Sequence, residues 1–452
     1  MYIMQFCWQR KELNNYKFHE FIMRVLIIPI MLIFHLVGYG QFKNVKLPIP
    51  KKATYYYSQV EPSIYINPNN TNEVIAGSVL NDYYYSVDGG LNWKSKSIKS
   101  KKNGVHGDPC MLIDDKGNYY YFHLSNIDGK TLVGGIVCER SKTIRGRFNK
   151  EGHTLVNGKF HDKEWVATNK ENDNIYMTWT QFDEYDSKDP QKRSNILFSK
   201  SEDFGKSWSS PVDISKFDGD CLDDDLTTEG AVPTVGPNGE IYVCWALDSK
   251  LYFNYSMDDG SSWLNQEMVI GEQKGGWALD IPGIYRCNGM PVTVCDISSS
   301  SNRGTIYVNW ADQRNGKDNT DIWIKKSKDR GKTWSSDIKV NSDDSNHHQF
   351  LSWMTVDQST GYLYVIYYDR REHEDNKTDV YLSVSKDGGD SFKDYKISEK
   401  PFLPNDEVFF GDYTNISACN GVIRPIWTHL DDIVISLYTA IVNQNDLNKS
   451  SN

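Results

Sequence analysis

The sequence predicts an all-β protein, a β-propeller of four-stranded antiparallel blades, and three observations support that prediction. Aromatic residues are abundant, with 28 Tyr, 18 Phe and 13 Trp, and such side chains suit the half-buried surface of a sheet. Short strand-like runs alternate with Asn, Asp and Gly turns, whereas long apolar stripes at helical spacing are missing. One turn motif recurs along the chain, which is typical of a repeat architecture.

The first 40 residues differ from the rest and are interpreted as a secretory signal peptide. Met23 and Arg24 precede an apolar run over residues 25–37, and Gly38-Tyr39-Gly40 follows it. This order of basic, apolar and small residues is that of a cleaved leader, and the run is shorter than the roughly 20 residues of a membrane span. We expect a secreted, periplasmic or cell-surface protein, with Met23 as an alternative start. The competing interpretation is a buried strand.

The charge of the chain limits the classes of binding partner that we expect, and its cysteine content limits the possible disulfides. Without residues 1–40 the chain has 46 Lys and Arg against 58 Asp and Glu, a formal charge of −12. Such a surface repels nucleic acid, so neither a nucleic-acid partner nor a membrane span is expected. Seven cysteines remain, and an odd number leaves at least one thiol outside an internal disulfide. Cys221 and Cys287 are a candidate pair, with Cys295 as the alternative partner of Cys287.

The recurring motif reads Ser-x-Asp-x-Gly-x-x-Trp/Phe. Its five copies span residues 86–93, 201–208, 256–263, 327–334 and 385–392. The Asp carboxylate is expected to accept hydrogen bonds from its own turn, and Gly supplies the positive φ of a tight hairpin. We therefore predict that the motif holds turns and takes no part in catalysis.

This motif is the Asp box, and the chain resembles the sialidase-like BNR-repeat propellers from about residue 55 to residue 395. The interval from Asp88 to Asp203 is long enough for two units. Residues 141–148 lie in its middle as a degenerate sixth box that lacks the Asp. The resemblance implies blades in which each box joins the third strand to the fourth.

The number of blades follows from the strand-like runs. Three runs follow the last box, at residues 413–418, 422–428 and 433–441, and residues 42–47 can supply the fourth strand. The N- and C-terminal strands would then share one blade, which predicts seven blades, with six as the alternative. We expect one propeller domain over residues 41–442 and a polar tail over residues 443–452.

Acidic residues stand where the first strands of five units begin, on the face opposite the boxes, called here the upper face. They are Glu61, Asp108, Glu164, Glu229 and Asp412. Carboxyl groups crowded around one axis repel, so some should have raised pKa values or bind a cation. Asp108, Glu164 and Glu229 are candidate catalytic acids or bases. The cluster could also hold a structural Ca²⁺ through its oxygens, and otherwise no cofactor is expected. Alternatively, each carboxylate caps its own strand.

Arginines in predicted upper loops are candidates for binding an acidic group of a substrate. Arg286, Arg314 and Arg370 form this set, because guanidinium groups suit carboxylates and sulfates. Trp353 and Asp412 complete the candidate substrate-binding residues. The alternative is that Arg314 pairs with Asp312 and Arg370 with Asp369 inside their own loops.

The sialidase resemblance implies three arginines that hold the substrate carboxylate, a Tyr–Glu pair as nucleophile and helper, and an Asp acid/base. The first-blade arginine motif of true sialidases is absent, and the corresponding residues read Gln59-Val-Glu61-Pro62. Two hypotheses remain open. One is a secreted exo-glycosidase of sialidase-like type that acts on an anionic glycan. The other is a non-catalytic propeller that binds a glycan or a protein. The sequence does not indicate an oligomeric state.

Overall fold

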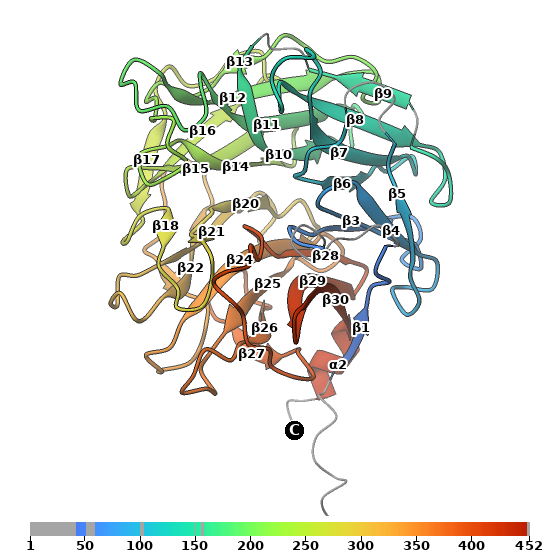
Figure 1. Cartoon of the computed structure of the whole chain (residues 1–452), viewed down its shortest axis with the longest axis vertical. Coiled ribbons are helices and arrows are strands. Elements are labelled where there is room, and N and C mark those ends of the chain that lie inside the picture. The colour runs from blue at the N-terminus through green and yellow to red at the C-terminus, as the bar shows by residue number, and fades with distance from the viewer. Residues whose placement is uncertain (1–41, 51–58, 100–103, 149, 155–157, 450–452) are drawn as a thin grey trace, which may run out of the picture. The chain divides into compact units, whose positions relative to one another are not determined.

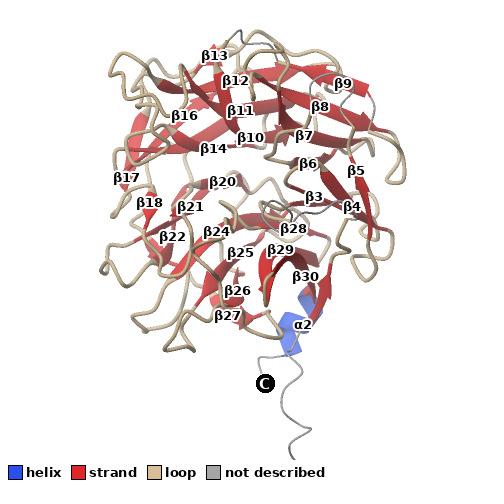
Figure 2. Cartoon of the chain, in the orientation of Figure 1, coloured by secondary structure: helices blue, strands red, loops and turns tan. Residues whose placement is uncertain are grey.

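Seven four-stranded antiparallel sheets form a ring of blades in the computed structural model (Figure 1). The structure describes residues 42–50, 59–99, 104–148, 150–154 and 158–449. The predicted signal peptide lies outside these residues. Strands account for nearly all regular structure (Figure 2). Among the described residues, no helix has the length and apolar character needed to span a membrane. The predicted seven-bladed, all-β architecture is confirmed.

The blades follow one another along the chain, each beginning with its innermost strand. Blade one holds β2 (Ser63–Ile66), β3 (Val74–Ser78), β4 (Asp82–Ser86) and β5 (Lys94–Ser97). Blade two holds β6 (Cys110–Ile113), β7 (Tyr119–Ser125), β8 (Gly135–Ser141) and β9 (Lys150–His153). Blade three holds β10 (Phe160–Thr168), β11 (Ile175–Phe182), β12 (Ser194–Ser201) and β13 (Val212–Asp213). Blade four holds β14 (Glu229–Val235), β15 (Ile241–Leu247), β16 (Lys250–Ser256) and β17 (Met268–Glu272).

A short ribbon separates blades four and five, and it consists of β18 (Ala278–Leu279) and β19 (Cys287–Asn288). Blade five holds β20 (Val292–Cys295), β21 (Ile306–Asp312), β22 (Asp321–Ser327) and β23 (Ile338–Lys339). Blade six holds β24 (Gln349–Asp357), β25 (Tyr362–Asp369), β26 (Asp379–Ser385) and β27 (Lys393–Lys396). Blade seven holds β28 (Asn415–Cys419), β29 (Val422–Asp431), β30 (Val434–Asn443) and β1 (Lys43–Lys46).

The two ends of the chain close the ring in blade seven. Strand β1 pairs antiparallel with β30, from Lys43 opposite Ile441 to Lys46 opposite Tyr438. Phe42 and Leu47, on either side of β1, are buried. This pairing covers a sheet edge that would otherwise be free to associate, and it confirms the predicted closure.

The expected polar tail is partly helical. Helix α2 (Gln444–Lys449) follows β30 directly, and Leu447 is fully buried. Its carbonyl accepts a hydrogen bond of 2.9 Å from the hydroxyl of Tyr395 on β27. The tail therefore packs against blade six as far as the described residues extend.

The Asp boxes hold the turns in the way that the sequence predicts. In the blade-five box, Asp329 Oδ1 accepts from Ser327 Oγ at 2.9 Å and from the amide of Thr333 at 2.9 Å. The hydrogen bonds from the side chain and amide of Thr333 lower the pKa of Asp329 to about 2. Gly331 has a φ of +82°, and a Cβ there would lie 2.3 Å from the ring of Phe253 in blade four. Glycine is thus required both by its own turn and by the neighbouring blade.

The degenerate box has the predicted place, between β8 and β9, but a different turn. Gly146 donates to the carbonyl of Thr143 at 2.8 Å, and Ser141 Oγ also donates to that carbonyl at 2.9 Å. In the five true boxes the glycine amide bonds the serine hydroxyl instead. The glycine follows the serine by five residues here rather than four, which accounts for the change.

The cysteines correct one expectation. All seven described cysteines carry free thiols, so the predicted Cys221–Cys287 disulfide is wrong, and so is the alternative with Cys295. The backbone of Cys221 forms an isolated antiparallel β-bridge with Ser187, whereas Cys287 lies on β19. Six of the seven are buried, where they act as small apolar side chains.

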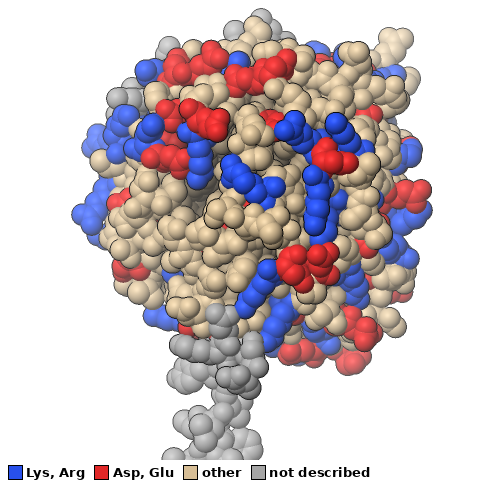
Figure 3. All heavy atoms as spheres, turned by 180° about the vertical axis from the view of Figure 1, so that it is seen from behind, with Lys and Arg blue, Asp and Glu red and all other residues tan. Residues whose placement is uncertain are grey.

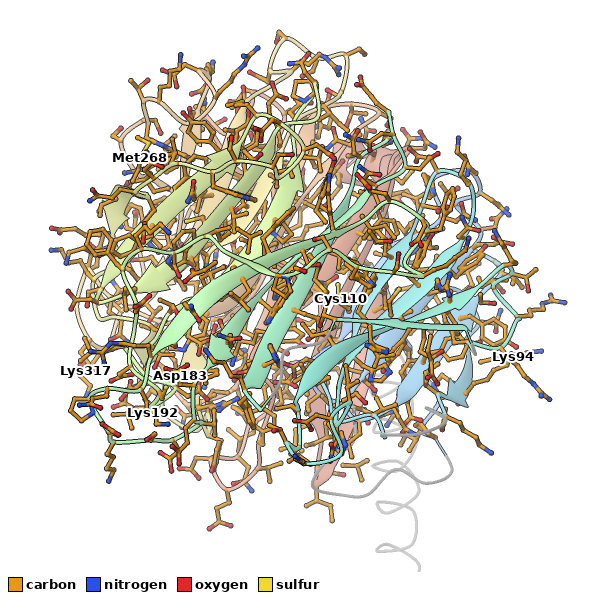
Figure 4. The ribbon with its side chains drawn as sticks, turned by 90° about the horizontal axis from the view of Figure 1, so that it is seen from above. Lys94, Cys110, Asp183, Lys192, Met268 and Lys317 are labelled. Carbon is orange, nitrogen blue, oxygen red and sulfur yellow. The ribbon has the colours of Figure 1, made fainter. Side chains whose placement is uncertain are left out.

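Charged side chains are mixed over the face seen in Figure 3, where Lys and Arg alternate with Asp and Glu and no basic stripe forms. The loops are sorted by face, as the topology requires. Asp183, Lys192 and Lys317 follow second strands and lie on one side of the molecule in Figure 4, whereas Met268, which follows a box, lies on the other. Cys110, on the inner strand β6, lies near the middle.

Candidate functional site

The structure gathers four acidic side chains around one ammonium group, and two of them, Glu229 and Asp412, are predicted upper-face carboxyls. Lys163 Nζ lies 2.7 Å from Asp162, 3.7 Å from both Asp223 and Glu229, and 3.8 Å from Asp412. These side chains come from blades three and seven and from the loop and strand that open blade four. We call the following set the axial cluster: Glu61, Asp108, Asp162, Lys163, Glu164, Asp223, Glu229, Arg286 and Asp412. Among the described residues it holds seven carboxyl groups and two cations.

The backbone at the start of the inner strands turns these side chains toward the axis. Glu61, Asp108 and Lys163 have φ values of 53°, 49° and 51°, in the left-handed region. This region costs a non-glycine residue about 1–2 kcal/mol. The pairing of β10 with β11 is interrupted by a bulge at the same point, between Asp162 and Trp165. Strained residues of this kind gather at functional sites.

Burial sets the protonation of most of the cluster. It raises the pKa of Glu61 to about 8, and the negative charge of Asp412 adds to the shift. Burial likewise raises the pKa values of Asp108, Glu164 and Glu229 well above their ordinary values. For Asp223, burial acts in the same direction, but Lys163 and Arg286 outweigh it and hold the pKa well below its usual range. Protonated and ionised carboxyl groups therefore stand side by side.

The acidic oxygens offer a donor set that suits Ca²⁺, but a lysine occupies their centre. Oxygens of Asp162, Asp223 and Glu229 all lie within 4.8 Å of one another, as the ligands of one hard cation would. Lys163 Nζ lies within 3.7 Å of each of these three groups. The ammonium group thus takes the position of the expected ion. The residues as placed do not fit a Ca²⁺ in addition to Lys163.

Arg286 covers the cluster from the solvent side. Its Nε donates to Asp412 Oδ1 at 2.8 Å and its Nη2 to Asp412 Oδ2, while Nη1 reaches Asp223 Oδ2 at 3.3 Å. The Arg286 side chain is 43% exposed, against 9% for Asp223 and 4% for Asp412. Arg286 therefore ties the loop before blade four to the loop before blade seven across the axis.

Aromatic side chains close the axis beneath the cluster. The ring of Trp165 lies 4.3 Å from that of Trp353 and 5.0 Å from that of Tyr413. Trp353, predicted to bind substrate, is 6% exposed and belongs to this plug. Below it, a cavity of about 420 Å³ is lined by the seven inner strands and reaches the turns at Lys170 and Asn420. The axial cluster and this cavity lie on opposite sides of the aromatic layer.

The predicted three-arginine group does not converge. Of Arg286, Arg314 and Arg370, only Arg286 contacts the axial cluster among the described residues. Arg314 is bound by Asp312 and by Asp337 (2.7 Å), and it stacks on Trp323 at 3.9 Å. The expectation that Arg314 points into the axis is wrong, because Asp312 and Asp337 of its own blade hold the guanidinium.

Arg370 also differs from the expectation. It is 3% exposed, donates to Thr378 Oγ1 at 3.1 Å and Asn376 Oδ1 at 3.3 Å, and lies over the ring of Phe350. The next residue, Arg371, makes the ion pair with Asp369. Burial lowers the pKa of Arg370 to about 10. Arg370 therefore packs inside blade six rather than facing the axial cluster.

Sequence reasoning missed three members of the cluster: Asp162, Lys163 and Asp223. The run His161-Asp162-Lys163-Glu164 is dense in charge at the start of an inner strand, which was an available signal. Alternation along a strand would place Lys163 and Glu164 on opposite sides. The left-handed turn at Lys163 breaks that alternation, and it has no signature in the sequence because the residue is not glycine.

Comparison with known proteins supports the fold. No family model matches the chain, and no curated protein matches it. An ulvan lyase, described as a new family of polysaccharide lyase, is 15% identical over 86% of this chain and 96% of its own, with a TM-score of 0.51. It has also been solved bound to -[GlcA(1-4)Rha3S]-. A Trypanosoma rangeli sialidase with the inhibitor DANA is 15% identical over 90% of this chain and 60% of its own, with a TM-score of 0.42.

At this identity, the likeness to the ulvan lyase concerns the fold. The class that fold and topology define is the seven-bladed β-propeller. The neighbours named above act on glycans by their own descriptions, a polysaccharide lyase and a sialidase.

Proposed function

We propose that this chain is a carbohydrate-active propeller that hydrolyses a glycosidic bond at the axial cluster. The observation that carries the proposal is the pair Asp223 and Glu229. Their oxygens lie within 4.8 Å of each other, and their surroundings lower the pKa of Asp223 and raise that of Glu229. Glycoside hydrolysis takes one protonated and one ionised carboxyl group, set by their environments. Glu229 would be the acid, and Asp223 the nucleophile or base.

The separation of the two groups bears on the stereochemistry. Retaining enzymes hold their carboxyl groups about 5–5.5 Å apart, and inverting enzymes about 6.5–9.5 Å apart. An oxygen of Asp223 and an oxygen of Glu229 lie within 4.8 Å of each other, a separation nearer to the retaining range than to the inverting one. Because Arg286 covers Asp223, a substrate reaches the pair when Arg286 releases Asp223 and Asp412. The strained backbone at Lys163 and Glu61 would hold the groups beneath in place during that movement.

The sequence adds a finer form of the proposal, a secreted, sialidase-like exo-glycosidase that acts on an anionic glycan. The glycan-acting proteins of similar fold support the general class. The glycans tested for turnover therefore include anionic ones.

A non-catalytic, glycan- or protein-binding propeller is the second candidate. It is favoured by the closed axis, where Trp165, Trp353 and Tyr413 are in contact, and by the carboxylate partners of Arg286 and Arg314. A site that binds without cleaving needs no path to Glu229, which is fully buried.

Turnover measurements on a glycan panel distinguish the two candidates. The purified chain is incubated with sialosides, uronides, sulfated and uncharged oligosaccharides, beside the variants Glu229→Gln and Asp223→Asn. We expect cleavage of one class, reduced at least about a hundredfold by either substitution in variants that remain folded. Arg314→Ala is the matched control, because Arg314 lies outside the cluster. Binding without cleavage by the unmodified protein would favour the second candidate.

A further inference from the structure

The charges of the axial cluster bear on the class of glycan that it accepts. Both of its cations already have carboxylate partners. Lys163 Nζ is within 4 Å of four carboxyl groups. Three nitrogen atoms of Arg286 donate to Asp412 and Asp223. A carboxylate or sulfate brought to Arg286 would lie beside these two acidic groups and would be repelled by them.

Unsatisfied oxygens in and beside the axial cluster indicate a partner that donates hydrogen bonds. The carboxyl oxygens of Glu164 and the hydroxyl of Tyr413 have no hydrogen-bond partner among the described residues. Glu164 is 1% exposed and Tyr413 3%, and burial, together with the nearby Asp108 and Glu61, raises the pKa of the Tyr413 hydroxyl well above its usual value. Buried polar atoms are rarely left without a partner. A hydroxyl, of water or of a sugar, can donate to these oxygens.

Exposed aromatic rings flank the cluster on two sides. Tyr285 precedes Arg286, is 59% exposed, and meets Phe409 edge to face at 6.3 Å. Tyr185 is 39% exposed, donates to Asp223 Oδ2 at 2.7 Å and stacks on Phe160 at 4.6 Å. Rings that combine an apolar face with a polar tip are common in binding sites. They can pack against the C–H face of a sugar without any charge.

We infer that the axial cluster takes an uncharged glycan, whose hydroxyls form hydrogen bonds with the carboxyl groups of the cluster and whose ring packs on Tyr285. This inference rests on the proposed function and refines it. It departs from the anionic substrate that the sequence predicts, because the arginines of that prediction are either paired within the cluster or held outside it.

Binding to a glycan array tests the inference. The array carries uncharged, carboxylated, sulfated and amine-bearing glycans, and the purified chain is the probe. We expect the uncharged class to bind, and titration calorimetry to give at least about tenfold weaker binding for a carboxylated form of the same glycan. The affinity should be nearly unchanged between about 50 and 500 mM NaCl, since salt screens charge pairs.

Single substitutions test whether the glycan binds at the axial cluster. Tyr285→Ala should weaken binding about tenfold, by the loss of one stacking ring. Leu91→Ala is the matched control, because Leu91 is a similarly exposed apolar residue, 43% exposed, in a box turn on the opposite face. Equal binding by the Tyr285→Ala and Leu91→Ala proteins would overturn the inference.

The remaining outcomes separate this inference from the proposed function. Tightest binding to carboxylated or sulfated glycans, weakened by salt, would overturn the uncharged class and leave glycan recognition intact. Tightest binding to amine-bearing glycans would also overturn the uncharged class, because it would show that the cluster prefers a positively charged glycan. Failure of all four classes to bind would overturn the proposed function itself.

Discussion

Replacing the box residue Asp329 by Ala tests whether the box turns stabilise the fold without taking part in binding at the upper face. The carboxylate accepts three hydrogen bonds, from Ser327 Oγ, Thr333 N and Thr333 Oγ1. Each is worth about 0.5–1.5 kcal/mol in net terms, and the turn is partly exposed, so the lower values apply. We expect a loss of about 1–2 kcal/mol in the free energy of unfolding. For a domain of this size, the melting temperature falls by about 2 °C.

The loss should depend on pH in a defined direction. The pKa of Asp329 is about 2 in the folded chain and about 3.9 in an unfolded one. The stabilisation is therefore complete above pH 4 and fades as the pH falls through 2. Calorimetric melting of both proteins at several pH values measures the difference. Lys328→Ala, at the exposed neighbouring position, is the control. Equal melting temperatures of the Asp329→Ala protein and the unmodified protein at pH 7 would refute the reasoning.

Four further substitutions test other parts of the structure. Phe42→Ala removes a buried ring beside the closing strand and should cost about 3–5 kcal/mol, measured by denaturant unfolding; an unchanged midpoint would contradict terminal closure. Arg314→Ala should lower the melting temperature and leave glycan turnover or binding at the level of the unmodified protein. An unchanged melting temperature with reduced turnover or binding would show that Arg314 acts at the site. Glu61→Gln removes a carboxyl whose pKa is raised to about 8. That group stabilises the fold below pH 4.5 and loses its contribution as the pH rises toward 8, so the variant should gain stability over the unmodified protein at pH 8 but not at pH 4. Lys163→Met vacates the centre of three carboxyl groups and should make the melting temperature rise with added Ca²⁺, whereas that of the unmodified protein should not respond.

The candidate site was predictable only in part. Glu61, Asp108, Glu164, Glu229 and Asp412 could be placed at one mouth because repeat spacing assigns each to the start of an inner strand. Their contacts could not be predicted in the same way. Arg370 and Arg371 are adjacent in sequence, yet Arg371 takes Asp369 while Arg370 is buried against Phe350.

The sequence by itself determined the architecture, because the information for it is local. Each box specifies its own hairpin through Asp and Gly, and the strand count requires β1 to complete the blade that β30 leaves open. Only the tertiary structure decided the site. Lys163 meets carboxylates from blades four and seven, and Arg286 links Asp223 to Asp412, 189 positions apart. Such contacts depend on the closure of the ring and on left-handed residues at its mouth, and neither is encoded in a short stretch of chain.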